Sequence, residues 1–496
     1  MKWFAVARPW LAVASVAAVL AGCSLAPEYQ RPGQPVPDNY PQLTPATDDL
    51  TAPSAADLGW SELFKDPQLQ ALVAVALENN RDLRIAIDRV EEARAMFGIA
   101  RSERFPSVGI GANAQVTRTP EDLRMGGAAA DSVSRVYMAG AALAAFELDF
   151  FGRIKNLSEA AYQRFLATEQ ARRTVHINLV AQVAEAYFRY RSAVELVGLM
   201  QKTLNSRENT YRLVKARYDS GVASALDLHQ AQSQLDAVRA DLAAIERIQA
   251  QAENALQLIL GTPMPDNLPE ATVFGKDQLL ERIPAGLPSD LLERRPDILA
   301  AENALRAANA NIGAARAAFF PNISITGLLG FASPELGGLF SGSNRYWEYA
   351  PQIQVPIFEG GALRGNLEVA EVRKNIAVSE YERAIQVAFR EVADALAGEA
   401  TYAGQLDALR ALQDSGLRTL ELARQRYETG IDSFLQVQTA EVNLYATQQQ
   451  LIQTGFESLL NRIELYRALG GGWHRDTLAN ASKDPDDEKG DNGEAS

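Results

Sequence analysis

The chain has 496 residues, 47% of them hydrophobic, so it is long enough for more than one ordinary domain and can bury a large core. Its 48 Lys and Arg residues against 62 Asp and Glu residues give a net charge of -14, which argues against a surface built for nucleic acid. One cysteine and three scattered histidines exclude an intrachain disulfide framework and a cysteine-rich zinc site, and leave little material for a histidine-ligated metal.

The first residues predict export and lipidation. Two basic residues precede an apolar run from Leu11 to Leu20, which makes residues 1–22 typical of a bacterial secretory signal peptide. Leu20-Ala21-Gly22-Cys23 resembles a lipobox, in which the signal is cut before the cysteine and the cysteine receives a diacylglycerol and an N-acyl chain. We therefore predict Cys23 as a lipid attachment site and expect no other cofactor. An unmodified cysteine after an ordinary signal is the alternative. Because Ser24 follows, and not Asp, the outer membrane is the favoured destination.

Proline positions divide the mature chain into a tether and long helices. Seven prolines lie between Pro27 and Pro53, so residues 23–60 are expected to run extended over the surface. No proline occurs from Glu121 to Thr262 or from Ile357 to Asp484, and both stretches are rich in Ala, Leu, Gln, Arg and Glu. A single helix from Arg153 to Tyr218 would extend about 100 Å.

An internal repeat organises the rest of the chain. Arg217-Tyr218-Asp219-Ser220-Gly221 and Arg426-Tyr427-Glu428-Thr429-Gly430 lie 209 residues apart, and Arg101–Pro106 matches Arg316–Pro321. Each half is expected to contain a helix, two strands and two long helices. The predicted segments are a first repeat (61–261), an equatorial linker (262–286), a second repeat (287–473) and an acidic disordered tail (474–496).

Each repeat also predicts a turn between its two long helices. Gly221 and Gly430 can adopt the left-handed conformation that ends a helix. The residues that follow resemble capping boxes that open the next helix, namely Ser224 with Asp227 and Ser433 with Gln436. Each motif therefore predicts an antiparallel helical hairpin.

Four segments alternate between apolar and polar or small residues, as half-buried strands do. They are Ser107–Thr117, Val136–Leu148, Asn322–Phe331 and Trp347–Ile357. Their length is that of a tilted membrane strand, ~9 to 11 residues, although a half-buried soluble sheet has the same period. The predicted location in the outer membrane favours membrane strands over a soluble sheet. No segment after the signal has the ~18 apolar residues that a spanning helix needs, so a chain that crosses the membrane must use strands.

Four strands predict an oligomer. Strands span lipid only in a closed barrel, which needs about eight strands or more. We favour a cyclic trimer with a twelve-stranded barrel over a dimer. Loops 118–134 and 332–346 lie at one end of the strands and the long helices at the other, so the helices are expected to project together into the periplasm. The predicted fold class is an α+β membrane protein, a barrel continuous with a helical tube.

The chain from about Trp60 to Trp473 resembles the outer-membrane factors of tripartite efflux pumps, in the lipidated OprM-like branch of the TolC family. The motifs that resemble this family are Glu147–Asp149, Phe151–Arg153, Leu287–Ile298, Ala301-Glu302, Ala315–Ser324 and Pro356–Gly361. The resemblance implies a homotrimer whose periplasmic α-barrel binds an adaptor protein and an inner-membrane transporter of the resistance-nodulation-division class. It also implies passive conduction of drugs, solvents or other toxic compounds to the exterior.

The resemblance further assigns roles to the hairpin tips. They would form the far end of the tube and meet the adaptor, which makes Tyr218, Gly221, Tyr427 and Gly430 candidate docking residues. A turn that only reverses the chain is the alternative role of the glycines.

The closed gate is expected at the same tips, with the second hairpin as the inner one. The candidate gate residues are Arg426, Tyr427, Ile431 and Asp432. Three copies of Asp432 would form an acidic ring that suits cations, Tyr427 would hydrogen bond a neighbouring helix, and Arg426 would pair with a carboxylate there. An ordinary solvated surface is the alternative for each.

Two other classes of protein compete with a channel. An enzyme is disfavoured because the chain has no Gly-rich phosphate loop, no GxSxG motif and no metal-spaced histidine pair. A lipidated periplasmic scaffold or adaptor would share the signal and the helical hairpins, but the four alternating segments argue against it.

Overall fold

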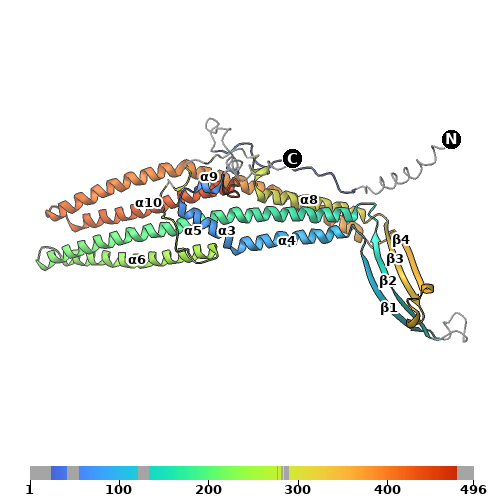
Figure 1. The fold of residues 1–496 in the computed structure, drawn as a ribbon. Helices are drawn as coiled ribbons and strands as arrows, with labels where there is room; N and C mark the ends of the chain where they lie inside the picture. The colour runs from blue at the N-terminus through green and yellow to red at the C-terminus, as the bar shows by residue number, and fades with distance from the viewer. Residues whose placement is uncertain are drawn as a thin grey trace, which may run out of the picture. The chain divides into compact units, whose positions relative to one another are not determined.

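The computed structural model describes residues 24–41, 55–120, 133–275, 278–280, 283 and 290–476 (Figure 1). The predicted signal, Cys23 and residues 477–496 of the predicted tail lie outside the described residues. The elements are α2 (Trp60–Leu63), α3 (Pro67–Asn79), α4 (Arg81–Ser102), β1 (Val108–Arg118), β2 (Val133–Glu147), α5 (Arg153–Asp219), α6 (Ala225–Leu260), α7 (Leu291–Arg294), α8 (Pro296–Ala317), β3 (Asn322–Ser333), two short 3₁₀ turns (Leu336–Gly338 and Gly342–Asn344), β4 (Arg345–Gln354), α9 (Ala362–Glu428) and α10 (Phe434–Ala468).

The chain forms two compact units, and each unit combines segments of both sequence repeats. The first unit contains the four strands, and its described residues are 24–32, 89–120, 133–169 and 300–381. The second unit contains both helical hairpins, and its described residues lie within 33–41, 55–88, 170–275, 278–280, 283, 290–299 and 382–476. The two compact units therefore do not coincide with the two predicted sequence repeats, 61–261 and 287–473.

In the first unit, all four strands form one antiparallel sheet in the order β1-β2-β3-β4. The predicted strands are confirmed, with shifted ends. β2 begins three residues earlier than predicted, and β4 ends three residues earlier, at Gln354, so that Val355 and Ile357 lie beyond the strand although we predicted them within it. Pro356 has no N–H to donate to a neighbouring strand, and it restricts the residue before it, which accounts for this early end.

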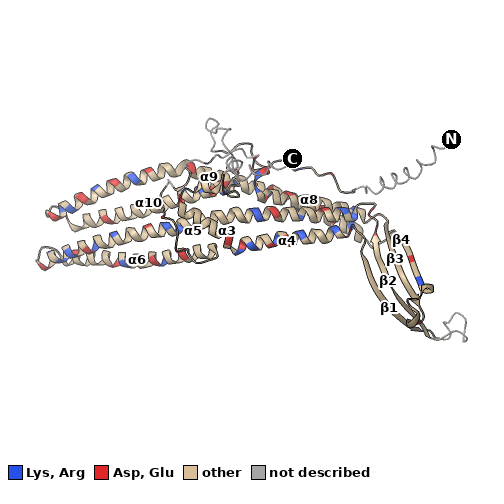
Figure 2. Ribbon diagram, viewed as in Figure 1, with Lys and Arg blue, Asp and Glu red and all other residues tan. Residues whose placement is uncertain are grey.

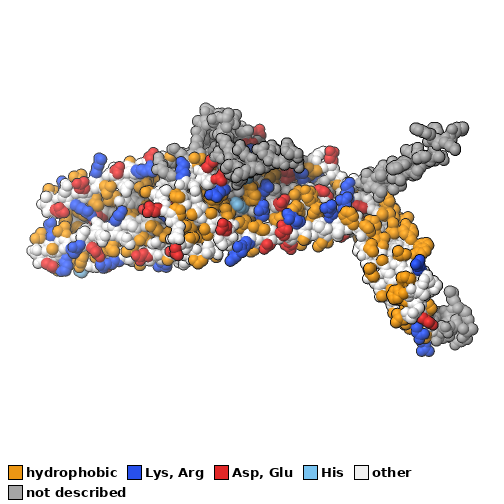
Figure 3. Space-filling model, in the orientation of Figure 1, with side chains coloured by type: hydrophobic (Ala, Val, Ile, Leu, Met, Phe, Trp, Pro, Cys, Tyr) orange, Lys and Arg blue, Asp and Glu red, His pale blue; other side chains and the backbone are white. Residues whose placement is uncertain are grey.

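The surface of the sheet has the character of a membrane segment. Charged side chains occur only towards the strand ends, at Arg118, Arg135, Glu147, Arg345 and Glu348. Figure 2 shows the strands almost without charge, and Figure 3 shows hydrophobic side chains over them. In the single chain, Ile110 is 91% exposed and Trp347 is 75% exposed. Large apolar side chains that are this exposed in one chain are normally covered by lipid or by a protein partner.

The sheet also has two open edges. β1 and β4 are the outer strands, and each pairs on one side only within the described chain. Unpaired edge groups are not tolerated in hydrocarbon. The sheet therefore becomes complete only when further strands pair with β1 and β4.

The long helices follow from the proline-free stretches. α5 and α9 each have 67 residues, and α5 ends at Asp219, one residue after the predicted end. α6 and α10 run back from them as the second arms of two helical hairpins (Figure 1). None of the helices within the described ranges is long and apolar enough to cross a membrane.

In the second unit, one buried carboxylate holds the linker against the helices. Asp66 is 0% exposed and caps α3 by accepting from the N–H of Gln68 at 2.9 Å. It also accepts from the hydroxyl of Tyr187 on α5 at 2.7 Å and from the linker residues Thr272 at 3.0 Å and Gln278 at 3.2 Å. The predicted linker is thereby fixed to α3 and α5.

A buried arginine from the Leu287–Ile298 motif has a similar role. The guanidinium of Arg295 donates to Asp297, to Glu391 of α9 at 2.9 Å and to the carbonyl of Ala468 at the end of α10 at 2.8 Å. It therefore joins the start of α8 to the second hairpin. In this chain the motif has a clear structural function.

The sheet makes a sharp prediction about Gly140, in the middle of β2 opposite Gly330. A Cβ at Gly140 would lie 2.5 Å from the carbonyl oxygen of Leu329 and 2.7 Å from the Cα of Gly330. We expect Gly140→Ala to force β2 and β3 apart, to destabilise the sheet by about 1–3 kcal/mol and to lower the yield of heat-modifiable oligomer on a gel.

Gly109→Ala in β1 is the matched control, since a Cβ there meets nothing within 4 Å. Equal oligomer yields from both variants would contradict the close approach of β2 and β3.

Candidate functional site at the hairpin tips

The two hairpin turns have the same backbone. Gly221 has φ 75° and Gly430 has φ 76°, so both adopt the predicted left-handed conformation. In the first turn, the N–H of Val222 donates to the carbonyl of Arg217 at 2.9 Å, and in the second, Ile431 donates to Arg426 at 2.9 Å. These bonds satisfy carbonyls that the helix end leaves free. The turn prediction is confirmed in both repeats.

The residues after the turns differ. Ser224 and Asp227 form the predicted capping box, with both side chains accepting from the opposite backbone N–H. Ser433 occupies the corresponding position before α10, but its side chain makes no cap bond, so that half of the prediction is wrong. The N–H of Gln436 donates instead to the backbone carbonyl of Ser433 at 3.2 Å.

The Arg426 side chain has its partner within its own hairpin. It donates to both carboxylate oxygens of Asp432, at 2.6 and 3.1 Å, on the exposed surface of the turn. The hydrogen bond from Arg426 lowers the pKa of Asp432. Within the described chain Arg426 therefore pairs with Asp432, and the pairing with a carboxylate of a neighbouring helix stays a prediction. Arg426 thus partly balances the negative charge of Asp432, whereas we expected a ring of unpaired Asp432 carboxylates.

Tyr427 also faces inward in its own chain. It is only 8% exposed and packs with Phe434, Val437, Val214 and Ala231, so that all four long helices meet at this cluster. The guanidinium of Arg217 lies 4.8 Å from the centre of its ring, within the range of a cation–π interaction.

The hydroxyl of Tyr427 has no hydrogen-bond partner among the described residues, and burial raises its pKa. The predicted hydrogen bond to a neighbouring helix is thus absent within this chain. Ile431 and Tyr218, by contrast, lie on the exposed surface of the tips.

Behind the tips lies a buried ion cluster that we did not predict. Glu441 of α10 is 5% exposed and pairs with Arg207 of α5, which is 4% exposed. Arg424 of α9 also donates to Glu441, at 2.6 Å, and to the hydroxyl of Ser206 at 2.8 Å. One carboxylate therefore joins three of the four long helices.

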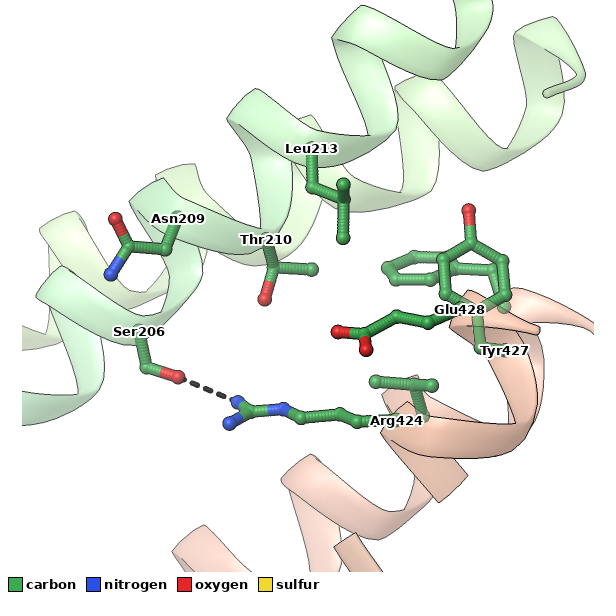
Figure 4. A pocket seen from close by; sticks show the side chains of 9 residues that line it. Ser206, Asn209, Thr210, Leu213, Arg424, Tyr427 and Glu428 are labelled. Carbon is green, nitrogen blue, oxygen red and sulfur yellow. Dashed lines mark hydrogen bonds between the residues drawn. The ribbon is translucent and has the colours of Figure 1, made fainter. Parts of the chain in front are cut away.

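A small pocket opens between this cluster and the tip. It has a volume of about 190 Å³ and lies between α5 and the end of α9. Figure 4 shows the Arg424–Ser206 hydrogen bond crossing between these helices and the Glu428 carboxylate directed into the pocket.

A signal for the cluster was present in the sequence. Phe434, Val437 and Leu444 form an apolar stripe with helical spacing, and Glu441 interrupts it. A carboxylate in a buried stripe requires a cationic partner, but the sequence does not say which arginine supplies it.

A charge-poor sheet with open edges and two long helical hairpins in one duplicated chain define a subunit of an outer-membrane channel. The family model for outer membrane efflux proteins matches residues 72–262 and 287–471, so the chain belongs to that family. The two matched ranges correspond closely to the two repeats.

Similar proteins span nearly the same length. The chain is 45% identical to the solvent efflux pump outer membrane protein SrpC of Pseudomonas putida, over 92% of this chain and 96% of that protein. It is 43% identical to the outer membrane protein OprJ of Pseudomonas aeruginosa, over 92% and 95%. The solved open state of the MtrE outer membrane channel of Neisseria gonorrhoeae is 37% identical, with a TM-score of 0.83 over 92% of this chain and 100% of that one.

Family membership confirms the predicted fold class, function and location. The chain is the outer-membrane channel component of an efflux pump, of the α+β, trimeric type, and it extends into the periplasm. It is a passive channel and not an enzyme.

The buried cluster predicts that removing a buried carboxylate destabilises the hairpins far more than removing an exposed one. Glu441→Ala would leave Arg207 buried without its partner, which costs about 3–5 kcal/mol. We expect amide hydrogen exchange in residues 434–445 to accelerate by roughly 100-fold or more, measured by mass spectrometry.

Asp219→Ala removes one partner of the exposed Lys215–Asp219 pair and is the control, with an expected effect below about 1 kcal/mol. Similar exchange in the two variants would remove Glu441 from this structural role.

Proposed function

We propose that three copies of this chain form the outer duct of a tripartite efflux pump, fed by a periplasmic adaptor and an inner-membrane transporter of the resistance-nodulation-division class. The main support is the four-stranded sheet with two open edges, since three copies supply twelve strands and leave no edge unpaired. The duct conducts passively, and its cargo is drugs, organic solvents or other toxic compounds. A similar protein is named for solvent efflux, which supports this class of cargo.

The lipid anchor is part of the proposal. Cys23 carries a diacylglycerol and an N-acyl chain, as the lipobox-like sequence before it indicates. Mass spectrometry of the mature N-terminal peptide is expected to find residues 1–22 absent and lipid mass on Cys23. Because each buried CH₂ contributes only ~0.8 kcal/mol, the acyl chains reinforce a barrel that inserts by itself. Cys23→Ser behind an ordinary signal should still insert, whereas an unmodified Cys23 in the native protein would refute lipidation.

The hairpin tips are the proposed adaptor-docking surface. Tyr218 is exposed there, and the turns at Gly221 and Gly430 have open space around them, while Tyr427 supports the surface from below. A β-branched residue strains a left-handed turn. We expect Gly221→Val and Gly430→Val to weaken co-purification of the adaptor while the amount of trimer in the membrane stays normal. Unchanged adaptor recovery from both variants would restrict these glycines to turning the chain.

The closed gate is proposed at the second tip, formed by Arg426, Tyr427, Ile431 and Asp432. The exposed Arg426–Asp432 pair and the apolar Ile431 face outward from the turn. Asp432→Ala together with Tyr427→Phe is expected to raise open probability and lower cation preference in planar bilayers. Each contact contributes only ~1 kcal/mol, so single changes leak slightly and combined changes leak more, although coupled contacts need not add.

The single variants separate the roles of these two residues. Tyr427→Phe alone should change little if its hydroxyl has no partner, and a leak from it would reveal a partner in another subunit. Unchanged conductance and selectivity in the double variant would leave the gate to Ile431.

A further inference from the structure

The segment directly after the proposed lipid site is docked on the first unit, although the sequence predicted only an extended tether. The hydroxyl of Ser24 donates to the side-chain carbonyl of Asn156 on α5 at 2.7 Å. The side-chain amide of Asn309 on α8 donates to the backbone carbonyl of Pro27 at 2.7 Å. We call residues 24–31 the clasp.

The far end of the clasp is held by a nearly buried carboxylate. Glu302 of α8 is 3% exposed and accepts from Arg31 at 2.7 Å, from Arg306 at 2.8 Å and from the hydroxyl of Tyr29 at 3.1 Å. The guanidinium of Arg306 also lies 4.8 Å from the centre of the Tyr29 ring. Burial raises the pKa of Glu302, but the hydrogen bonds from Arg31 and Arg306 outweigh it and the pKa is lowered. The carboxylate is therefore charged when the clasp is docked.

A glycine inside α8 makes room for the clasp backbone. A Cβ at Gly313 would lie 2.7 Å from the backbone nitrogen of Ala26 and 2.8 Å from its Cα, and 2.6 Å from Nδ2 of Asn156 on α5. Glycine is unfavourable within a helix compared with alanine, so its presence here needs a local reason. The close approach of Ala26, together with that of the Asn156 side chain, supplies that reason.

The other repeat provides an internal comparison. Gly98 of α4 occupies the position equivalent to Gly313, but a Cβ at Gly98 meets nothing within 4 Å. The clasp-binding residues of α8 have no equivalents in α4, where Ile87, Glu91 and Arg94 stand in the places of Glu302, Arg306 and Asn309. The groove is thus specific to the second repeat.

We propose that the groove on α5 and α8 is a specific binding site for the clasp, and that its occupancy joins the two sequence repeats and stabilises the assembled channel. α5 belongs to the first repeat and α8 to the second, and they meet beside the clasp through Ala160, Ala307 and Ala310. If Cys23 is lipidated, as proposed above, the clasp also fixes the acyl chains beside the first turns of α5.

The test uses the full-length channel purified as its native oligomer. Gly313→Ala blocks the groove and Arg31→Ala removes one contact from the clasp side without altering a helix, while Gly98→Ala is the matched control. The readouts are chymotrypsin cleavage after Tyr29, followed by mass spectrometry, and the temperature at which the oligomer dissociates on a gel. We expect cleavage to be roughly tenfold faster in Gly313→Ala and Arg31→Ala, with a lower dissociation temperature, and unchanged in Gly98→Ala.

The Arg31→Ala effect decides the proposal, because Gly313→Ala also brings a Cβ against the Asn156 side chain of α5 and so disturbs the α5–α8 contact with or without the clasp. Arg31 contacts Glu302 from the clasp, so without a functional clasp Arg31→Ala would leave the dissociation temperature unchanged. That result, or equal cleavage in all variants, would overturn the proposal. The same variants in a Cys23→Ser background should respond alike, because docking needs no lipid, so failure of the lipidation proposal would be seen separately in the N-terminal mass.

Discussion

The open edges of the four-stranded sheet are the constraint on which the rest of this structure depends. β1 and β4 each present one row of backbone N–H and C=O groups without a partner in the chain. In hydrocarbon each such group costs several kcal/mol, so one chain is not a stable membrane unit. Each repeat contributes only one pair of strands, and the channel therefore exists only as an assembly. The long helices, whose apolar faces are partly exposed in one chain, depend on the same assembly.

Buried ions hold the helical parts of one chain in register. The helices are rich in alanine, and small apolar contacts alone define position poorly along such long elements. Asp66, Arg295 and Glu441 each contact two or more elements that are far apart in the sequence. Each is satisfied by several hydrogen bonds, and such a network favours one arrangement because a partly satisfied one is costly.

Local features were predictable from the sequence, whereas the partners of side chains were not. The strands, the ends of α5 and the left-handed Gly221 and Gly430 follow from short-range patterns and proline positions. Arg426 pairs with Asp432 six residues away, and Tyr427 packs against Arg217 of the other hairpin, and neither contact has a sequence period that would indicate it. The clasp was predicted as part of a tether because the prolines from Pro27 to Pro53 indicate extended backbone, and extended backbone is equally suited to docking in a groove.

The contrast between the two ion pairs of the second hairpin limits how its tip can move. Arg426–Asp432 is exposed, and pairs of that kind contribute only about 0–1 kcal/mol, so the last turn can rearrange easily. Arg207–Glu441 is buried, and separating it would leave the Arg207 charge buried without its carboxylate partner. The same carboxylate ties α9 and α10 to α5 through Arg424 and Arg207. Movement that widens the tip is therefore least costly between Glu441 and the turn at Gly430. The three helices that Glu441 joins would shift together.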